Sequence, residues 1–206
     1  MNQITGAVFQ LIVLIFSVMV HEVAHGAVAY KLGDTTAKDM GRLNLNPLKH
    51  IDMMGSIILP LFLFITRSPI LIGWAKPVPY NPFNLKNPKT GAALIGIAGP
   101  VTNLLLAIIF GILIRIFGVI SNFQNGILIE FFQVIVFINV LLAIFNLVPI
   151  PPLDGSKALF AILPNRYFGI QRFLEQYGIF LLIAFIMFGF PFITPIIGLV
   201  YGLIVG

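Results

Sequence analysis

Long apolar runs separated by short polar loops dominate the chain. The first run covers residues 6–30, which at a rise of about 1.5 Å per residue is long enough to cross the hydrocarbon core of a bilayer. Runs of similar character cover about 91–117 and 127–148, and a last apolar stretch covers 177–206. The pattern predicts an α-helical polytopic membrane protein with a core of three transmembrane helices and additional C-terminal membrane segments.

The C-terminal stretch is interrupted by three helix-breaking residues, Gly189, Pro191 and Pro195. Proline removes a backbone donor and kinks or ends a helix. The pattern therefore fits either one kinked span or a tight hairpin.

The stretch between the first two runs, residues 31–90, has a mixed character. In 42–47 polar and apolar residues alternate before an Asn-Pro turn, which predicts a short strand on the cytoplasmic side. Residues 55–73 are apolar between basic flanks but interrupted, which favours a re-entrant or half-inserted element. The interrupting residues are Pro60, Arg67 and Pro69. Residues 74–88 hold four prolines, so we expect an edge strand or an extended loop there.

Basic residues in the loops indicate the orientation in the membrane. The loops after the first and third runs are both basic, with Lys31, Lys38, Arg42 and Lys49 in one and Lys157, Arg166 and Arg172 in the loop 155–176. The positive-inside rule places both loops in the cytoplasm. We therefore read the net charge of +5 as a topology signal and expect a multi-pass protein of the cytoplasmic membrane with no nucleic-acid partner.

Composition narrows the chemistry that the chain can perform. It is 59% hydrophobic and 9% charged, which is typical of a protein whose solvent is the lipid bilayer. The absence of cysteine excludes disulfides, Cys-ligated zinc, iron–sulfur clusters and thiol catalysis. The N-terminus lacks a basic region and a cleavage site, so we expect no cleavable signal peptide.

An HExxH motif lies inside the first apolar run, at His21, Glu22 and His25. Residues four apart share one helix face, so both imidazoles can reach one Zn²⁺ while Glu22 acts on the attacking water. His21 lies about 13 Å from the end of the run marked by Lys31, well below the membrane surface. The alternative is a pair of packing histidines, but ionisable groups within a membrane are usually functional.

A catalytic zinc ion takes three protein ligands and keeps one open position. Most acidic residues lie in or beside loops and read as solvated surface charges: Asp34, Asp39, Glu130 and Glu175. Asp154 differs, because it follows a proline-broken transmembrane helix at the inner face. It is either a third ligand or the N-cap of a short helix starting at Gly155. Val28 and Lys31 exclude the extended metzincin motif.

Three segments together resemble the site-2 protease family of intramembrane zinc metalloproteases. They are HEVAH at 21–25, GPVTN at 99–103 and NLVPIPPLDG at 146–155. The resemblance covers about 6–160 and implies that Asp154 is the third ligand of one Zn²⁺ per chain. It further implies that Glu22 takes a proton from the attacking water and passes a proton to the leaving amine, while zinc polarises the scissile carbonyl.

Other residues have two readings. Asn146 and Asn103 either contact the substrate or oxyanion, or hold helices together. His50 and Asp52 match the family's segment after the first span, where His50 is either a ligand or a structural or gating residue. The segment 74–79 resembles the family's membrane-associated strand region. Pro77, Val78 and Pro79 are therefore predicted to bind the extended backbone of a substrate.

The predicted function is regulated intramembrane proteolysis, with transmembrane proteins as substrates and the active site toward the cytoplasm. We treat residues 1–206 as a single domain of a compact form without PDZ or CBS domains. A divalent-metal transporter and an inactive membrane scaffold are the alternatives. Transport would need further polar groups across the membrane, and an intact Glu22 with its presumed ligands argues against a scaffold. The sequence predicts neither the oligomeric state nor the physiological substrate.

Overall fold

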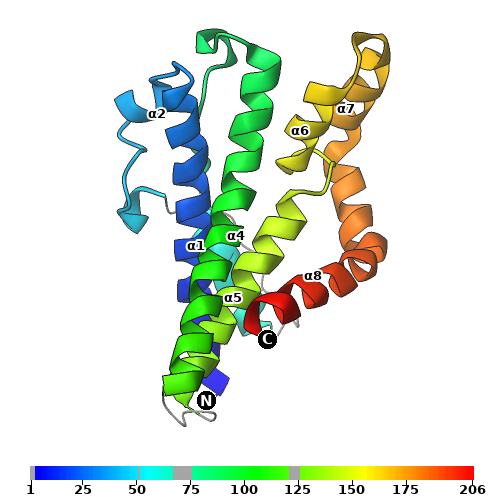
Figure 1. The fold of residues 1–206 in the computed structure, drawn as a ribbon. Helices are drawn as coiled ribbons and strands as arrows, with labels where there is room; N and C mark the ends of the chain where they lie inside the picture. Colours follow the sequence, from blue (N-terminus) through cyan, green and yellow to red (C-terminus); the bar gives the residue numbers. More distant parts are fainter. Residues whose placement is uncertain (1–2, 51, 67–75, 121–125) are drawn as a thin grey trace.

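The computed structural model of the protein describes residues 3–50, 52–66, 76–120 and 126–206. Three long helices form its centre: α1 (Gln3–Lys31), α4 (Pro88–Ile120) and α5 (Ile127–Asn146). They run up, down and up along one another in Figure 1, and each packs against the other two. The C-terminal ends of α1 and α5 therefore lie at the same end of the molecule, as the basic loops predicted.

Within the described residues, four helical segments are long and apolar enough to cross a membrane. They are Ile4–Lys31, Pro88–Gly118, Ile127–Asn146 and Phe168–Val205. Large apolar side chains cover their outer surfaces, with Ile12 48% and Leu105 53% exposed, whereas Asn103 and Asn139 inside are 0% exposed. This distribution suits a lipid solvent, in which small and polar side chains hold helices together. The class of an α-helical polytopic membrane protein is thus as predicted.

The predicted strand at 42–47 is absent, and no strand occurs in the part of the chain that the structure describes. Residues 42–46 are irregular, and a 3₁₀ turn, η1 (Pro47–Lys49), follows them. The side chain of Asn44 accepts a hydrogen bond from the amide of Asn46 at 2.8 Å. Such local side-chain bonds compete with strand pairing, and no described strand lies beside this segment to pair with it.

The rest of the intervening region is helical in short pieces. After α2 (Thr36–Asp39) and η1, a π-helical turn, η2 (Met53–Ile58), leads into α3 (Leu59–Ile65). These two elements together have 13 residues, too few to cross a bilayer. The predicted interruptions at Arg67 and Pro69 and the segment Trp74–Ala75 lie outside the described residues.

We call residues 76–84 the strap. Residues 76–81 are extended and Pro82–Asn84 form a 3₁₀ turn, η3. The amide of Lys76 donates to the carbonyl of His50 at 2.8 Å, which joins the strap to the η1 region. Of the two forms expected for this proline-rich stretch, an extended loop is the one observed.

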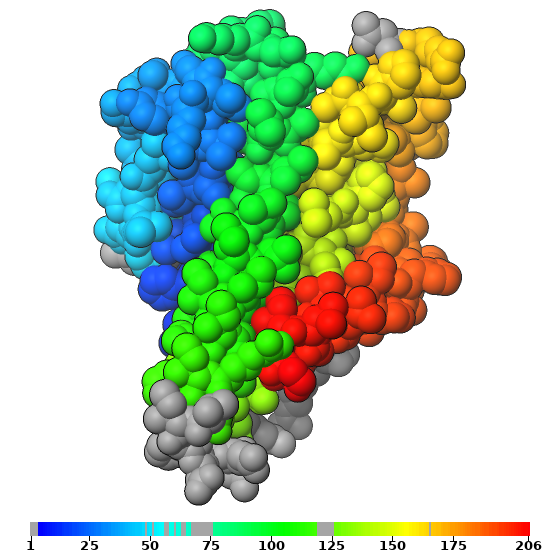
Figure 2. Space-filling view, in the orientation of Figure 1, coloured from blue at the N-terminus to red at the C-terminus, as the bar shows by residue number. Residues whose placement is uncertain are grey.

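The chain after α5 is more helical than its sequence indicated. The predicted loop 155–176 contains α6 (Gly155–Ile162), the 3₁₀ turn η4 (Asn165–Tyr167) and the start of α7 (Phe168–Ala184). A π-helical turn, η5 (Phe185–Gly189), joins α7 to α8 (Phe190–Val205). The chain bends there, and α8 packs against α5 and α4. Figure 2 shows α6 and α8 beside α4 at different heights.

Candidate metal centre

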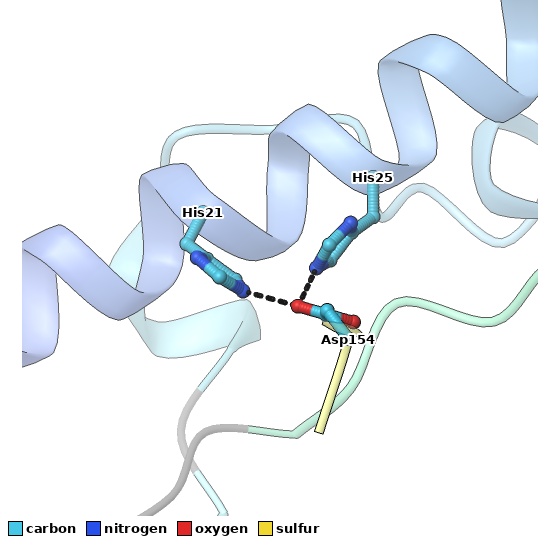
Figure 3. A group of neighbouring side chains, drawn as sticks. All are labelled: His21, His25 and Asp154. Carbon is cyan, nitrogen blue, oxygen red and sulfur yellow. Dashed lines mark hydrogen bonds and ion pairs between the residues drawn. The ribbon is translucent and has the colours of Figure 1, made fainter. Parts of the chain in front are cut away.

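His21, His25 and Asp154 come together inside the helical core, and all three are buried. One ligand atom from each lies within 4.8 Å of the others. Asp154 Oδ2 lies 2.9 Å from Nε2 of His21 and 3.0 Å from Nε2 of His25. Figure 3 shows both imidazoles directed at the Asp154 carboxylate. Among the described residues this is the one cluster of His, Asp and Glu groups with the spacing of a metal site.

Local structure explains how these residues meet. Successive turns of α1 carry His21 and His25, whose rings lie 4.6 Å apart edge to face. Gly99 on α4 leaves room for the His21 ring, because a Cβ there would lie 2.5 Å from two of its ring atoms. The proline-rich segment after α5 then returns Asp154 to this level. Asp154 occupies the N-cap position of α6 but makes no side-chain capping bond, so its carboxylate is available to the imidazoles.

The hydrogen bonds of the two imidazoles make the cluster suitable for a cation. His25 Nδ1 lies 2.6 Å from the carbonyl oxygen of Ile95, which can only accept, so Nδ1 carries the hydrogen. Nε2 of a neutral His25 is then a lone pair facing a carboxylate. Two imidazole nitrogens and one carboxylate oxygen are donors that Zn²⁺ prefers, and three protein ligands leave a position for reactants. The donor set therefore fits zinc.

A chain of buried side chains, which we call the polar chain, lies behind His21. Asn103 Oδ1 lies 2.5 Å from His21 Nδ1, and Asn103 Nδ2 donates to Asn139 Oδ1 at 2.8 Å. Asn139 Nδ2 donates to the hydroxyl of Ser17 at 2.9 Å. Sequence reasoning missed Asn139 and Ser17, although their position as polar residues in apolar runs was a usable signal.

Lys157 neutralises the second oxygen of Asp154. Its Nζ lies 2.9 Å from Asp154 Oδ1, and it also lies 5.7 Å from the centre of the Tyr80 ring in the strap. The Lys157 ammonium, an opposite charge at hydrogen-bond distance, favours the ionised form of Asp154. Asp154 is therefore charged.

Glu22 contacts the strap. Its Oε2 accepts a hydrogen bond from the backbone amide of Val78 at 2.8 Å. The Val78 side chain is buried and lies close to Gly26 on α1. Pro77 is exposed and Pro79 half-buried. The segment predicted to bind substrate thus lies against the predicted catalytic carboxylate.

Asp34 anchors the other end of the strap, and its expected role as a solvated surface charge is wrong. The residue is 0% exposed. Its Oδ2 accepts from the amide of Asn81 at 2.7 Å, and its Oδ1 accepts from Asn84 Nδ2 at 2.8 Å. Thr36 adds two further bonds to Oδ1.

Of the other candidates, Asn146, His50 and Asp52 make hydrogen bonds with residues outside the ligand cluster. Asn146 Nδ2 donates to the carbonyl of Leu142, one turn earlier in its own helix, at 3.0 Å. His50 is outside the metal cluster, and its Nε2 donates to the Asn44 carbonyl at 2.7 Å. Asp52 caps η2 by accepting from the amide of Gly55 at 2.8 Å. Asn103 contacts the cluster through its hydrogen bond with Nδ1 of His21.

Comparisons with known proteins add an independent result. The sequence profile described as Peptidase family M50 matches residues 9–189. The "Putative zinc metalloprotease YwhC" of Bacillus subtilis (strain 168) is 39% identical over 193 residues, covering 91% of this chain and 81% of that protein. The "Putative zinc metalloprotease Rip2" of Mycolicibacterium smegmatis is 31% identical over 147 residues, covering 70% of this chain and 53% of Rip2.

A more distant relative, "Zinc metalloprotease MJ0392" of Methanocaldococcus jannaschii, is 29% identical over 166 residues. These residues cover 81% of this chain and 37% of MJ0392. No solved structure matches the chain.

Proposed function

The chain belongs to Peptidase family M50, the site-2 protease family of zinc metalloproteases, and from that premise we propose that it is an intramembrane endopeptidase. Its substrates would be transmembrane segments of other membrane proteins, cut in regulated intramembrane proteolysis. The observation that carries the proposal is the convergence of two imidazole nitrogens and a carboxylate within the helical core. Glu22, on the same helix turn, supplies the acid–base group.

The ligand residues would hold one zinc ion per chain. When bound, zinc would polarise the scissile carbonyl and make an adjacent water more acidic. His21 and His25 supply neutral nitrogen ligands, because each has its Nδ1 within hydrogen-bond distance of an acceptor. Asp154 supplies the negative charge, and Lys157 keeps its second oxygen occupied.

Glu22 moves the protons in this proposal. Its carboxylate takes a proton from the attacking water and delivers a proton to the leaving amine nitrogen. The Val78 amide holds one carboxylate oxygen, Oε2, which restricts the rotation of the side chain. The other oxygen is then the one that exchanges protons with water and substrate.

The strap limits how a substrate backbone can bind. A peptide bond in a helix is shielded by its own hydrogen bonds, so the substrate must unwind before attack, and an extended segment can receive it. Pro77 and Pro79 have no amide hydrogen, and the Val78 amide already bonds Glu22. Residues 77–79 therefore offer carbonyl oxygens, to which amides of the unwound substrate would donate.

Asn146 has a proposed role in substrate or oxyanion binding. Its amide bonds the Leu142 carbonyl in this structure. It would have to turn away from that carbonyl to donate to the oxygen of the scissile bond.

Basic loops support the proposed orientation in the cytoplasmic membrane. The metal centre lies toward the end of the molecule where α1 and α5 finish; Lys31 ends the first span there, and Lys157 and Arg166 lie after the third. The positive-inside rule makes this end cytoplasmic.

The test is cleavage of a model transmembrane substrate in liposomes, with bound zinc quantified in parallel. Wild type should cleave and bind zinc. Glu22→Gln should bind zinc without cleaving, because the amide cannot accept the proton. Asp154→Asn should lose most of its zinc. Glu175→Gln, at an exposed residue of α7, is the matched control and should behave as wild type.

The transporter and scaffold alternatives predict other results. Zinc-dependent ion flux into the liposomes without cleavage would favour a transporter. If neither wild type nor Glu22→Gln cleaved any substrate and no ion flux occurred, a scaffold would be favoured.

A further inference from the structure

We propose that Asn139, which touches none of the three ligands, sets the tautomer of His21 through Asn103 and thereby presents His21 Nε2 to the metal. Asn139 is a positioning residue in this proposal. The inference rests on the metal centre of the proposed function and does not depend on proteolysis.

The direction of the polar chain is set at the end remote from the metal centre. Asn139 Nδ2 lies 2.9 Å from the backbone carbonyl of Ile135, one turn earlier in α5. A carbonyl oxygen only accepts hydrogen bonds, so it must face the NH₂ group of Asn139. The same NH₂ group donates to the Ser17 hydroxyl at 2.9 Å. Asn139 Oδ1 must therefore point toward Asn103.

The orientation of Asn103 follows from that of Asn139. Oδ1 of Asn139 accepts, so the group of Asn103 that faces it at 2.8 Å is the NH₂. The backbone carbonyl of Ser17, 3.4 Å away, is a second acceptor for the same NH₂ group. A flipped Asn103 would place its oxygen against two acceptors. Its Oδ1 is thus left facing His21.

His21 then has one favoured tautomer. Asn103 Oδ1 lies 2.5 Å from Nδ1 and requires a hydrogen there, which leaves Nε2 with its lone pair directed at Asp154 and the metal position. If Asn103 were flipped, its NH₂ would face Nδ1, the hydrogen would move to Nε2, and His21 could not serve as a ligand from that nitrogen.

The two histidines differ in how they are held. His25 is oriented by a backbone carbonyl, that of Ile95, which no side-chain substitution removes. His21 is oriented by two asparagines on two other helices, α4 and α5. The orientation of His21 therefore depends on the packing of three helices and is open to mutation.

The first experiment needs no variant. Long-range ¹H–¹⁵N NMR of the zinc-loaded wild-type protein reports which ring nitrogen of each histidine carries a hydrogen. We expect Nδ1–H at His21 and His25 and Nε2–H at His50, whose Nε2 donates to the Asn44 carbonyl. A neutral Nε2–H form at His21 overturns the proposal.

The second experiment measures zinc affinity by competition with a chelator. Asn139→Leu keeps the side-chain volume but removes the nearer of the two acceptors that orient Asn103, leaving the Ser17 carbonyl at 3.4 Å. We expect zinc affinity to fall about tenfold and Nε2–H to grow in at His21. Thr102→Val is the matched control, because Thr102 lies beside Asn103 and its hydroxyl donates to the Ala98 carbonyl of its own helix, so the zinc affinity of this variant should match wild type. Unchanged affinity in Asn139→Leu overturns the proposal.

A rescue variant separates orientation from packing. In the Asn139→Leu background, Asn103→Asp presents an oxygen to His21 whichever way the side chain rotates, so zinc affinity should return toward wild type. A purely structural role for Asn139 predicts no rescue and would count against the inference. Because tautomer and zinc affinity are measured without substrate, a failure of proteolysis leaves these readouts unaffected, and the reverse also holds.

Discussion

The buried polar chain and the strap hold neighbouring residues of α1 by different means. Ser17, Asn103 and Asn139 are at most 4% exposed and orient His21 through side-chain hydrogen bonds between α1, α4 and α5. The strap reaches Glu22 through one backbone amide and is anchored further along at Asp34. One region is packed inside the helical core, and the other lies against it as an extended segment.

This difference separates two parts of the chemistry. The orientation of the proposed ligand His21 depends on the helical core, whereas that of Glu22, the proposed proton-transfer group, depends on the strap. Metal binding and catalysis should therefore be separable by mutation. Changes in the polar chain or beside His21 should reduce zinc affinity, and changes in the strap should reduce turnover while zinc remains bound.

The largest effect is expected from Gly99→Ala, which disturbs the helical core beside His21. The new Cβ would lie 2.5 Å from Cε1 and Nε2 of His21, so the ring has to move. Overpacking of this kind costs about 1–3 kcal/mol, and displacement of a ligand atom should lower zinc affinity at least about tenfold. Chelator competition and thermal unfolding measure the two effects.

Gly118→Ala provides the matched control in the same helix. A Cβ at Gly118 meets nothing within 4 Å. Its zinc affinity should equal that of wild type. If Gly99→Ala also bound zinc normally, the close approach of His21 to α4 would have no role in ligand placement.

The next effect is release of the strap by Asp34→Asn. The carboxylate accepts hydrogen bonds from Thr36, Asn81 and Asn84, and bonds to a charged acceptor contribute about 1.5–3 kcal/mol each. Losing about 2 kcal/mol of local stability should make strap amides exchange with solvent roughly 30-fold faster. Hydrogen exchange measured by mass spectrometry over 76–84 reports this directly.

The zinc affinity of Asp34→Asn tests whether the strap and the polar chain act independently. Asp34→Asn should bind zinc as wild type does, while substrate cleavage falls. Asp39→Asn is the control, because Asp39 is exposed and accepts a bond from Thr35 at 2.7 Å without touching the strap. A parallel loss of zinc in Asp34→Asn would show that the strap also supports the ligands.

The same division explains what the sequence could predict. The predicted spans 6–30, 91–117 and 127–148 correspond closely to α1, α4 and α5, because a bilayer imposes a length and an apolar composition that can be read locally. The motif spacing likewise placed His21 and His25 on one face of a helix. These features depend on nearby residues or on the solvent.

Features that depend on distant partners were missed. The sequence marks Asn139 as a polar residue in an apolar run but does not show that Asn103, 36 positions away, is its partner. Asp34 looks like a loop charge until Asn81, 47 positions later, is brought against it. The alternation at 42–47 satisfied the local pattern for a strand, but a strand also needs a neighbour to pair with.

A smaller effect is expected from Val78→Pro, which removes the backbone N–H that donates to Glu22 and also replaces the Val78 side chain. Without that bond the carboxylate is less restricted, and kcat should fall several-fold, up to about tenfold, with zinc affinity unchanged. Val78→Ala keeps the amide and controls for loss of the side chain. A rise in KM at constant kcat would instead assign this position to substrate capture.

The smallest effect is the acid sensitivity of the strap. Burial raises the pKa of Asp34, but hydrogen bonds from Thr36, Asn84 and Asn81 together lower it by more than burial raises it, so the net pKa is below its ordinary value. A lowered pKa in the folded state means that Asp34 stabilises strap docking fully above the unfolded pKa of about 4, and that this contribution is lost as pH falls through the lowered value.

Strap exchange in wild type, corrected for the intrinsic pH dependence of exchange, should therefore stay slow from neutral pH to about pH 4 and speed up below it. Asp34→Asn should lack this change, because its amide does not titrate. The difference between wild type and variant isolates Asp34 from the other carboxylates that titrate in the same range. If both proteins lost strap protection in parallel on acidification, the anchor would lie in another carboxylate, and Glu22, at the opposite end of the strap contact, would be the next residue to substitute.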